Sequence, residues 1–304
     1  MAPVQSEVKA LGGLARALAT GRSKEESIVW RVWECGSQRP GRVAPVIVLL
    51  HGSYGSWTHW LRNVPAWSET CTVVAVDMPG FGESGNAPAQ RMPPDMGRAL
   101  GEGWLALQDR LPVLAVQGAP LFLAGFSLGG IYAGWMLRYL MRADSGIKRR
   151  PAGLLLFGPG GLGHRPGLDF GLKPVSQRHQ SPMERAAAHR HNLEVLMFAR
   201  AENIDDQAVA IQDENVASAR FRGPFTAHPS SLLDALEGVD LPLLGVWGGR
   251  DAFDADVRTR IAALRAVAPQ MESVVVPDAG HWVIYECARC VNAAAMEWIN
   301  KISP

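Results

Sequence analysis

Short runs of apolar residues alternate along this chain with longer segments whose apolar residues recur at helical spacing, and this alternation limits the fold more than any other feature. Uninterrupted apolar runs are typical of strands that are buried on both faces, and the segments between them have the length of crossover helices. The sequence therefore predicts an α/β fold with a mostly parallel sheet. The expected strands are Ile28–Trp33, Pro45–Leu50, Thr72–Val76, Leu121–Ala124, Gly153–Phe157, Leu243–Trp247 and Ser273–Val276.

The composition suits one large domain that carries an insertion. The chain has 304 residues, of which 47% are hydrophobic and 19% are charged, and its net charge is +1. A nucleic-acid-binding protein would carry a clustered basic surface, so this balance argues against nucleic acid as a partner and favours a small-molecule substrate. A homodimer is compatible with the sequence, which does not determine the oligomeric state.

The sequence also limits the compartment. No stretch approaches a run of about 18 apolar residues, the length of a membrane span. Glu7, Lys9 and Arg16 interrupt any signal-peptide core near the N-terminus. The four cysteines, at positions 35, 71, 287 and 290, are too few for a disulfide scaffold in a chain of this length. We therefore expect a cytoplasmic protein without a membrane span.

One long segment departs from the alternation. Between residues 160 and 238 no strand is predicted, but two helical patterns are present, Pro182–Ala199 and Ile204–Ala219, the second begun by Asn203 with acids in its first turn. Its position after a strand, before the alternation resumes, favours a helical cap or lid. We expect residues 161–238 to form this cap, and residues 1–160 and 239–304 to form the core.

Chemically useful side chains follow several of the expected strands. Because ligands bind at the carboxyl ends of parallel strands, these side chains are expected at one edge of the sheet. A nucleophile, an acid and a base occur there in the chain order serine, aspartate, histidine, which is the order expected for hydrolases with a nucleophile elbow. The four segments are His51-Gly52-Ser53-Tyr54-Gly55, Gly125-Phe126-Ser127-Leu128-Gly129, Gly248-Gly249-Arg250-Asp251 and Pro277-Asp278-Ala279-Gly280-His281.

Some of these roles have competitors. Asp254 and Asp256 follow Asp251 closely, and an acid that does not pair with the histidine is expected to cap a helix. His51 lies outside the serine, aspartate and histidine set, and we expect it to brace its loop. The other histidines show no metal-ligand spacing with paired acids, so no metal site is expected.

The segment Gly80–Gly85 fits the pattern G-x-G-x-x-G and follows a strand. A dinucleotide site requires a helix to begin there, because the N-terminus of that helix receives the pyrophosphate. The segment that follows is rich in proline and is a poor helix start. No nicotinamide, flavin or other cofactor is therefore expected.

Together the His-Gly loop, the Gly-x-Ser-x-Gly elbow, the late aspartate and the Gly-His pair resemble the α/β-hydrolase superfamily, from Ile28 to Ile299; the segment that begins at Asp77 also resembles the loop these proteins carry. The resemblance implies an α/β-hydrolase fold, with a mostly parallel eight-stranded sheet flanked by helices and a helical cap inserted after strand 6. It also implies hydrolysis through a covalent intermediate.

The resemblance assigns a role to each residue. Ser127 would attack the substrate carbonyl, His281 would take and return the proton, and Asp251 would orient the imidazole. The backbone N–H groups of Leu128 and Ser53 would form the oxyanion hole.

Aromatic and apolar residues surround the expected catalytic loops, which favours an apolar acyl or aryl substrate. The expected pocket residues are Gly52, Tyr54, Phe126, Met197, Phe198, Gln212 and Trp282. We therefore expect a cofactor-free serine hydrolase that cleaves a small, partly apolar carboxylic ester. A serine at the elbow argues against dehalogenase and epoxide-hydrolase chemistry, since those relatives use an aspartate there. A non-enzymatic ligand receptor on the same fold is an alternative that the sequence leaves open.

A second alternative concerns the bond that is cut. The segments His51–Trp60 and Gly280–Glu286 are similar to the subgroup that hydrolyses carbon–carbon bonds in products of aromatic ring cleavage, and Trp282 stands where that subgroup often has tryptophan. That subgroup typically offers an arginine from the second cap helix, where this chain has Gln212; Arg220 and Arg222 lie further on. A neutral amide does not supply the charge of an arginine, so ester hydrolysis is the expected main activity.

Overall fold

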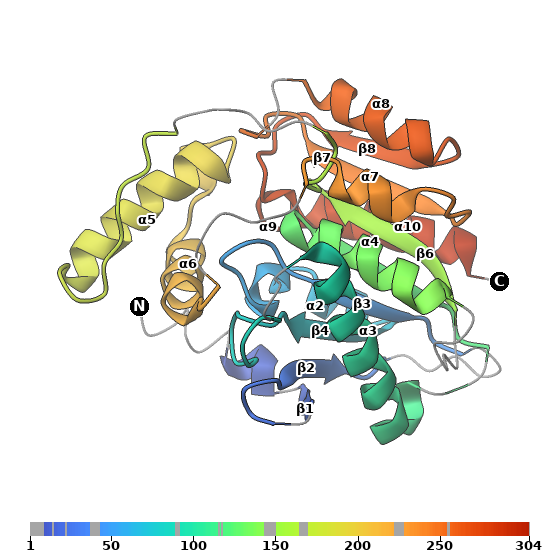
Figure 1. Cartoon of the computed structure of the whole chain (residues 1–304). Coiled ribbons are helices and arrows are strands. Elements are labelled where there is room, and N and C mark those ends of the chain that lie inside the picture. Colours follow the sequence, from blue (N-terminus) through green and yellow to red (C-terminus); the bar gives the residue numbers. More distant parts are fainter. Residues whose placement is uncertain are drawn as a thin grey trace.

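The computed structural model describes residues 9–13, 15–21, 23–36, 43–88, 92–114, 116, 118–142, 150–163, 170–221, 228–253 and 256–303. The strands among these residues form one eight-stranded sheet with the order β1-β2-β4-β3-β5-β6-β7-β8 (Figure 1). The pairs β1–β2 and β2–β4 are antiparallel and the other pairs are parallel. The strands are β1 (Arg16–Thr20), β2 (Ile28–Trp33), β3 (Val46–Leu50), β4 (Thr72–Asp77), β5 (Leu121–Phe126), β6 (Pro151–Phe157), β7 (Leu243–Gly248) and β8 (Glu272–Val276).

All seven strands expected from apolar runs are present, which confirms the α/β prediction. The eighth strand, β1, was expected only from the resemblance, because Arg16–Thr20 has no apolar run. It lies at the edge of the sheet and is mostly exposed, so packing does not impose an apolar sequence on it.

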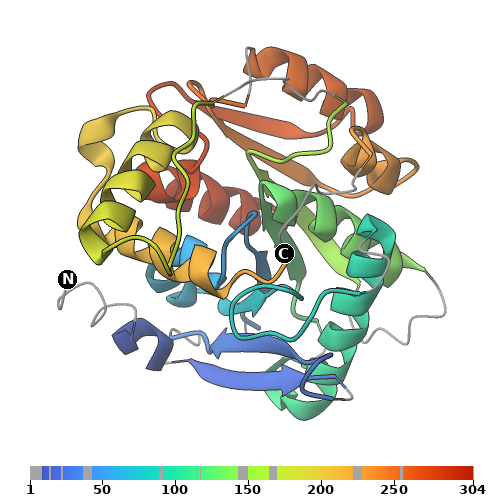
Figure 2. The same cartoon turned by 60° about the vertical axis from the view of Figure 1, so that its left-hand side comes forward.

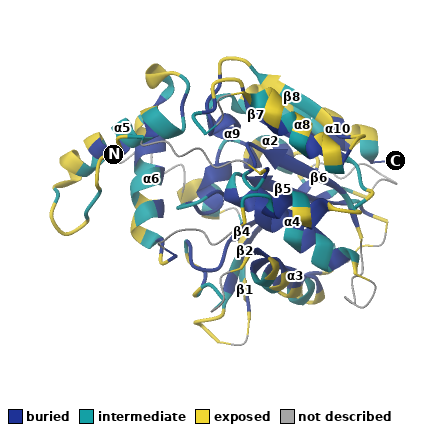
Figure 3. Cartoon of the chain, turned by 45° about the horizontal axis from the view of Figure 1, so that its top comes forward, coloured by how far each residue is buried: buried dark blue, intermediate teal, exposed yellow. Residues whose placement is uncertain are grey.

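Helices cover both faces of the sheet, and the side chains of each strand alternate between two apolar layers. In β3, Val46, Val48 and Leu50 pack into one layer, whereas Ile47 and Leu49 pack into the other. The first layer includes side chains from α3 (Pro93–Arg110), α4 (Leu128–Met141), α7 (Ser231–Leu236) and α8 (Val257–Val267). The second includes side chains from α2 (Val64–Ser68), α9 (Val283–Glu286) and α10 (Ala288–Ile302). Figure 3 shows the central strands as the most buried part of the molecule.

The helices α5 (Pro182–Leu196) and α6 (Asp206–Ser218) form a pair beyond one end of the sheet (Figures 1 and 2). A short 3-10 helix, η3 (Ala201–Asn203), joins them, and we call residues 182–218 the α5–α6 segment. The expected N-cap at Asn203 is wrong. Asp205 caps α6 instead, because its carboxylate accepts the Ala208 N–H at 2.8 Å.

The last helix of the expected cap range, α7, packs against α4. A Cβ on Gly134 of α4 would lie 2.7 Å from Leu232, and the Trp135 indole N–H donates to Ser231 Oγ at 3.0 Å. Among the described residues, no helix is long and apolar enough to cross a membrane.

Candidate active site

The register of the sheet brings the loops predicted to carry chemistry to one edge. Leu50 of β3 pairs with Gly125 of β5, so His51 and Ser127 both follow the end of adjacent strands. On the other side, Gly248 of β7 pairs with Val276 of β8, and Asp251 and His281 lie in the loops beyond them. Parallel pairing thus places the four loops side by side.

Ser127 occupies a strained position between β5 and α4. Its φ is 51° and its ψ is −116°, in a region that a residue with a Cβ rarely adopts. Three backbone hydrogen bonds hold it there: its N–H donates to Phe157 O at 2.9 Å, and its carbonyl accepts the N–H groups of Gly130 and Gly160. The serine hydroxyl is therefore held at the sharp corner that the sequence predicts.

Two glycines make this corner compatible with the packing of α4. A Cβ on Gly125 would lie 2.4 Å from the carbonyl oxygen of Gly129, and a Cβ on Gly129 would lie 2.3 Å from that of Leu50. The first oxygen belongs to the first turn of α4 and the second to β3, so both are fixed backbone atoms. Only glycine allows helix and strands to approach this closely.

Ser127, His281 and Asp251 form one chain of hydrogen bonds. The Nε2 atom of His281 lies 2.9 Å from Ser127 Oγ, and its Nδ1 atom lies 2.7 Å from Asp251 Oδ2. The other carboxylate oxygen of Asp251 accepts the Phe253 N–H at 2.9 Å, which fixes the carboxylate plane. His281 and Asp251 are buried, whereas Ser127 is half-buried. The structure thus brings together the three residues that were expected to act jointly.

The competing acids are placed differently. Asp256 caps α8 and accepts the Arg258 N–H at 2.9 Å, as expected for an acid that does not pair with the histidine. Asp254 lies outside the described residues.

The two expected oxyanion donors lie in different segments: Leu128 directly follows Ser127, and Ser53 lies in the loop after β3. Leu128 is the first residue of α4, so its N–H has no acceptor within the helix. Ser53 follows Gly52 in the loop after β3, and the Gly52 carbonyl accepts a hydrogen bond from His51 Nδ1 at 2.8 Å. The Gly52 carbonyl and the Ser53 N–H belong to one planar peptide unit, so this bond also orients the Ser53 N–H.

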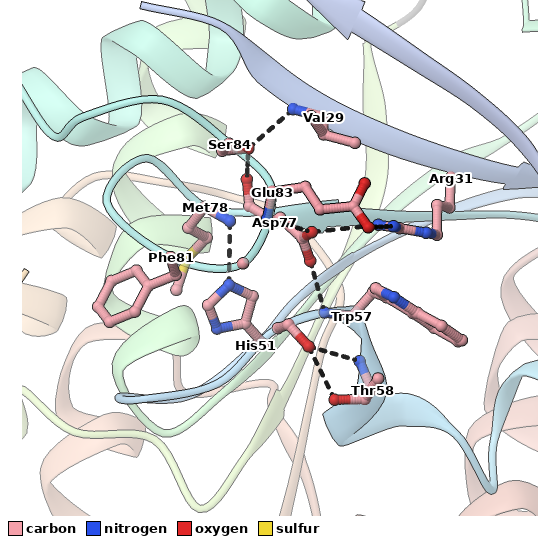
Figure 4. Close-up of polar contacts among 12 residues, drawn as sticks. Val29, Arg31, His51, Trp57, Thr58, Asp77, Met78, Phe81, Glu83 and Ser84 are labelled. Atoms are coloured by element: carbon pink, nitrogen blue, oxygen red, sulfur yellow. Dashed lines mark hydrogen bonds and ion pairs between the residues drawn. The ribbon is translucent and has the colours of Figure 1, made fainter. Parts of the chain in front are cut away.

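His51 braces this loop, as the sequence predicts. Its Nε2 atom accepts the Met78 N–H at 2.9 Å (Figure 4). The proton of the neutral ring therefore lies on Nδ1, which donates to the Gly52 carbonyl. Complete burial disfavours the charged ring and lowers the pKa of His51 to about 4. The ring therefore stays neutral and keeps both hydrogen bonds near neutral pH.

Asp77 organises the turn that contains Met78. Its carboxylate accepts hydrogen bonds from the Arg31 guanidinium at 3.1 Å, the Trp57 N–H at 2.9 Å and the Glu83 N–H at 3.0 Å (Figure 4). Arg31 also lies over the Trp57 ring, 5.2 Å from its centre. Three segments distant in sequence thus meet at one buried carboxylate.

Sequence reasoning missed three residues that touch this machinery. His59 accepts the Gly52 N–H on Nδ1 at 3.2 Å, and the Phe253 ring lies 4.5 Å from the His281 ring. Gly158 adopts a φ of +47°, and a Cβ there would lie 3.2 Å from His281 Nδ1. A glycine directly after a strand was a usable signal for Gly158. No local signal points to His59 or Phe253, whose contacts depend on the folded chain.

Comparison with known proteins gives the family to which a chain with this fold belongs. A model of the alpha/beta hydrolase family matches residues 47–293. The chain belongs to the alpha/beta hydrolase family.

Three relatives of this hydrolase are informative. It is 31% identical over 315 residues to the dihydrolipoyllysine-residue acetyltransferase component of the acetoin cleaving system of Pseudomonas putida, covering 98% of this chain and 74% of that protein. It is 26% identical over 271 residues to a 2-hydroxy-6-oxo-6-phenylhexa-2,4-dienoate hydrolase of Burkholderia cepacia, covering 83% and 87%. A thermophilic esterase from Thermogutta terrifontis has the same fold, with a TM-score of 0.65, 24% identity and coverage of 95% and 100%.

The expected pocket residues of this hydrolase occupy two kinds of position. Phe126 and Trp282 are fully buried, and their rings lie 5.5 and 5.1 Å from the His59 ring. Phe198 is also buried and packs against Trp282 at 5.8 Å. Gly52 is buried, and a Cβ added to it would lie 2.9 Å from the Phe126 ring. The half-buried residues are Tyr54, Met197 and Gln212.

Of the two arginines that follow Gln212 most closely in the sequence, Arg220 and Arg222, the structure describes Arg220, and its partners lie elsewhere. The Arg220 guanidinium donates to the backbone carbonyl groups of Phe81, Gly82 and Gly85, at 3.4, 3.2 and 3.3 Å. Arg222 lies outside the described residues. In the Gly80–Gly85 segment no helix begins among the described residues, and α3 starts only at Pro93. Arg220 therefore holds the loop that superficially matched a dinucleotide motif.

The neutral state of His51 leads to a stability prediction. Its pKa is near 6.5 in an unfolded chain and about 4 in the folded protein, so the folded state binds fewer protons between these values. The contribution of the neutral His51 ring to the free energy of unfolding is fully present above pH 6.5 and decreases as the pH falls from 6.5 toward 4. From pH 7 to pH 5 His51 should account for a loss of about 2 kcal/mol in the free energy of unfolding.

Urea unfolding of wild type and His51→Gln at both pH values measures this loss, because the variant lacks the titrating ring. We expect the His51→Gln free energy to fall by about 2 kcal/mol less than that of wild type. The exposed His228 provides the control, and His228→Gln should follow wild type. An equal fall in wild type and His51→Gln would contradict the neutral-ring assignment.

Proposed function

We propose that this chain is a serine hydrolase that cleaves a small, partly apolar carboxylic ester through an acyl-enzyme intermediate. The observation that carries the proposal is the hydrogen-bonded chain from Ser127 Oγ through His281 to Asp251, with distances of 2.9 and 2.7 Å. A strained serine persists only where its surroundings impose it, and such strain is concentrated at functional sites.

The proposed reaction has two halves, and it requires no cofactor. Ser127 Oγ attacks the ester carbonyl carbon while its proton passes to His281 Nε2, and the resulting imidazolium is stabilised by Asp251. The tetrahedral intermediate collapses, the alcohol leaves with the proton from His281, and an acyl-serine remains. A water molecule then gives a proton to His281 and attacks the carbonyl carbon of the acyl-serine. The second tetrahedral intermediate collapses as the bond between the acyl group and Ser127 Oγ breaks, His281 returns its proton to Ser127 Oγ, and the carboxylic acid leaves.

The oxyanion of each tetrahedral intermediate is assigned to the backbone N–H groups of Leu128 and Ser53. Donors that are oriented before the reaction need no reorganisation as charge develops, and each is typically worth about 3 to 4 kcal/mol. The bond from His51 to the Gly52 carbonyl supports this assignment, because it orients the peptide that carries the Ser53 N–H, and the bond from the Gly52 N–H to His59 holds the preceding peptide.

We assign the α5–α6 segment to a cap over this site, which with its flanking residues corresponds to the expected range 161–238. Thr58 donates to Asn215 of α6 at 3.2 Å, and the Trp282 N–H donates to the Met197 carbonyl at 2.8 Å. These bonds join the segment to the loops on both sides of Ser127. Its half-buried Met197 and Gln212 and the half-buried Tyr54 are the proposed contacts of the acyl or alcohol group.

Carbon–carbon hydrolysis is the second candidate, favoured by the identity to the Burkholderia cepacia dienoate hydrolase. A dienoate substrate carries a carboxylate, for which an arginine is the suited partner. Gln212 is neutral, and Arg220 is occupied by backbone carbonyl groups. Ester hydrolysis is therefore preferred.

The nucleophile can be tested by covalent labelling. A fluorophosphonate should modify wild type at Ser127, because His281 activates that hydroxyl, and should leave Ser127→Ala unmodified. Mass spectrometry of the peptide that contains residue 127 measures the result. Labelling at another residue, or full esterase activity of Ser127→Ala, would refute the mechanism. A folded wild type that neither reacts nor hydrolyses esters would favour the ligand receptor.

The acid can be tested by acid-to-amide variants. Asp251→Asn should lower kcat by about 10⁴-fold with the fold retained, because an amide no longer stabilises the imidazolium or selects its tautomer. Asp256→Asn is the matched control and should leave kcat nearly unchanged, since the asparagine still caps α8. A larger effect from Asp254→Asn than from Asp251→Asn would show that the wrong carboxylate was chosen.

The bond that is cut can be tested by substrate competition. We expect a higher kcat/KM on p-nitrophenyl esters than on a 2-hydroxy-6-oxo-dienoate, because Gln212 is neutral and the Arg220 guanidinium donates to backbone carbonyl groups. Steady-state kinetics on both series measures the preference. A preference of about a hundredfold for the dienoate, or roughly 3 kcal/mol, that is lost in Arg220→Gln or Arg222→Gln would reverse the order of the two candidates.

A further inference from the structure

Glu286, the last residue of α9, has a role that the proposed reaction does not assign. Its carboxylate accepts the Gly280 N–H at 2.7 Å, and Gly280 directly precedes His281. The same carboxylate accepts the N–H groups of Ala199 at 3.0 Å and Arg200 at 3.2 Å. One side chain thus joins the loop that carries the imidazole to the turn between α5 and η3.

The fourth partner of Glu286 is Asn203, the last residue of η3. Its side-chain amide donates to Oε1 at 2.9 Å. Within the described part of the chain, the donors to this carboxylate are therefore three backbone N–H groups and one amide, and no lysine or arginine side chain pairs with it. Hydrogen bonds to a charged acceptor are roughly twice as strong as neutral ones, so three of them hold the turn and η3 against the residue that also holds Gly280.

The turn also packs directly on the backbone beside His281. A Cβ on Gly280 would lie 2.6 Å from Ala199 N and 2.7 Å from Met197 O, so only glycine fits there. On the other side of His281, the Trp282 N–H donates to the Met197 carbonyl at 2.8 Å. Both neighbours of His281 are therefore bonded to the turn or to the side chain that anchors it.

We propose that Glu286 is a positioning residue for His281: by joining Gly280 to the turn at residues 199–200, its carboxylate sets the imidazole within reach of both Ser127 and Asp251. The proposal rests on the proposed function for its catalytic consequence. Its structural part, the placement of the ring against Asp251, does not depend on catalysis.

A second acid provides the comparison that separates positioning from general stability. Asp205 also joins the α5–α6 segment to the core: it pairs with Arg62 and accepts the Tyr285 hydroxyl at 2.8 Å. Like Glu286 it accepts a backbone N–H, that of Ala208 at 2.8 Å. Asp205 accepts no hydrogen bond from Gly280. Its removal therefore weakens a contact between the α5–α6 segment and the core that lies away from the loop carrying His281.

The test compares Glu286→Ala with Asp205→Ala by two measurements. The first is the far-downfield proton resonance of an imidazole N–H bonded to a carboxylate, which reports the His281–Asp251 bond. The second is the rate of fluorophosphonate labelling at Ser127. We expect Glu286→Ala to lose or broaden the resonance and to label about 10- to 100-fold more slowly, because a small misplacement of a catalytic group is costly. Asp205→Ala should keep the resonance and the labelling rate of wild type, even if its Tm falls by as much as that of Glu286→Ala.

Glu286→Gln covers the case in which the alanine variant does not fold. Its single acceptor oxygen can keep the Gly280 bond if Asn203 turns its amide, so we expect an intermediate loss. An unchanged resonance and labelling rate in the Glu286 variant that folds would overturn the proposal. Equal losses in Asp205→Ala would overturn it too, since they would show a general stability effect. A wild type with the resonance but no labelling would refute the proposed function and leave the positioning role intact.

Discussion

The backbone contact between α4 and the ends of β3 and β5 is the constraint on which the rest of the site depends. With Gly125 and Gly129 in place, the helix approaches the strands closely enough for Ser127 to turn the corner at a φ of 51°. A Cβ at Gly125 would meet a carbonyl oxygen of α4 at 2.4 Å, and one at Gly129 would meet a carbonyl oxygen of β3 at 2.3 Å. The position of the Ser127 hydroxyl, its bond to His281 and the place of the first N–H of α4 all follow from that packing.

The loop on the other side of Ser127 is held by buried polar groups. The Asp77 carboxylate accepts hydrogen bonds from Arg31 and from two backbone N–H groups. His51 accepts the Met78 N–H and donates to the Gly52 carbonyl, and His59 accepts the Gly52 N–H. A buried polar group without a partner costs free energy, so each of these bonds favours the loop conformation that makes it. The loop after β3 thereby gains rigidity, which the proposed oxyanion site requires.

The α5–α6 segment is joined to the core at several separate places, and these contacts have different effects. Asp205 pairs with Arg62, Asn215 accepts from Thr58, and Glu286 binds the turn beside His281. The first of these contacts lies away from the hydrogen-bonded chain and the last lies next to it. The same segment is therefore joined to the core at one end through Asp205 and, at the other, through the residue proposed to position the imidazole.

Local pattern determined the buried strands, the glycines of the corner and the order of Ser127, Asp251 and His281, because apolar runs and motif spacing are properties of neighbouring residues. The tertiary structure alone decided the edge strand β1, which no apolar run marks, and the start of α6 at Asp206, where Asp205 was better placed than Asn203. It also decided which acid faces His281 and the contacts of His59, Phe253 and Glu286. Those contacts join residues far apart in the chain, so their partners exist only once the sheet has set the loops side by side.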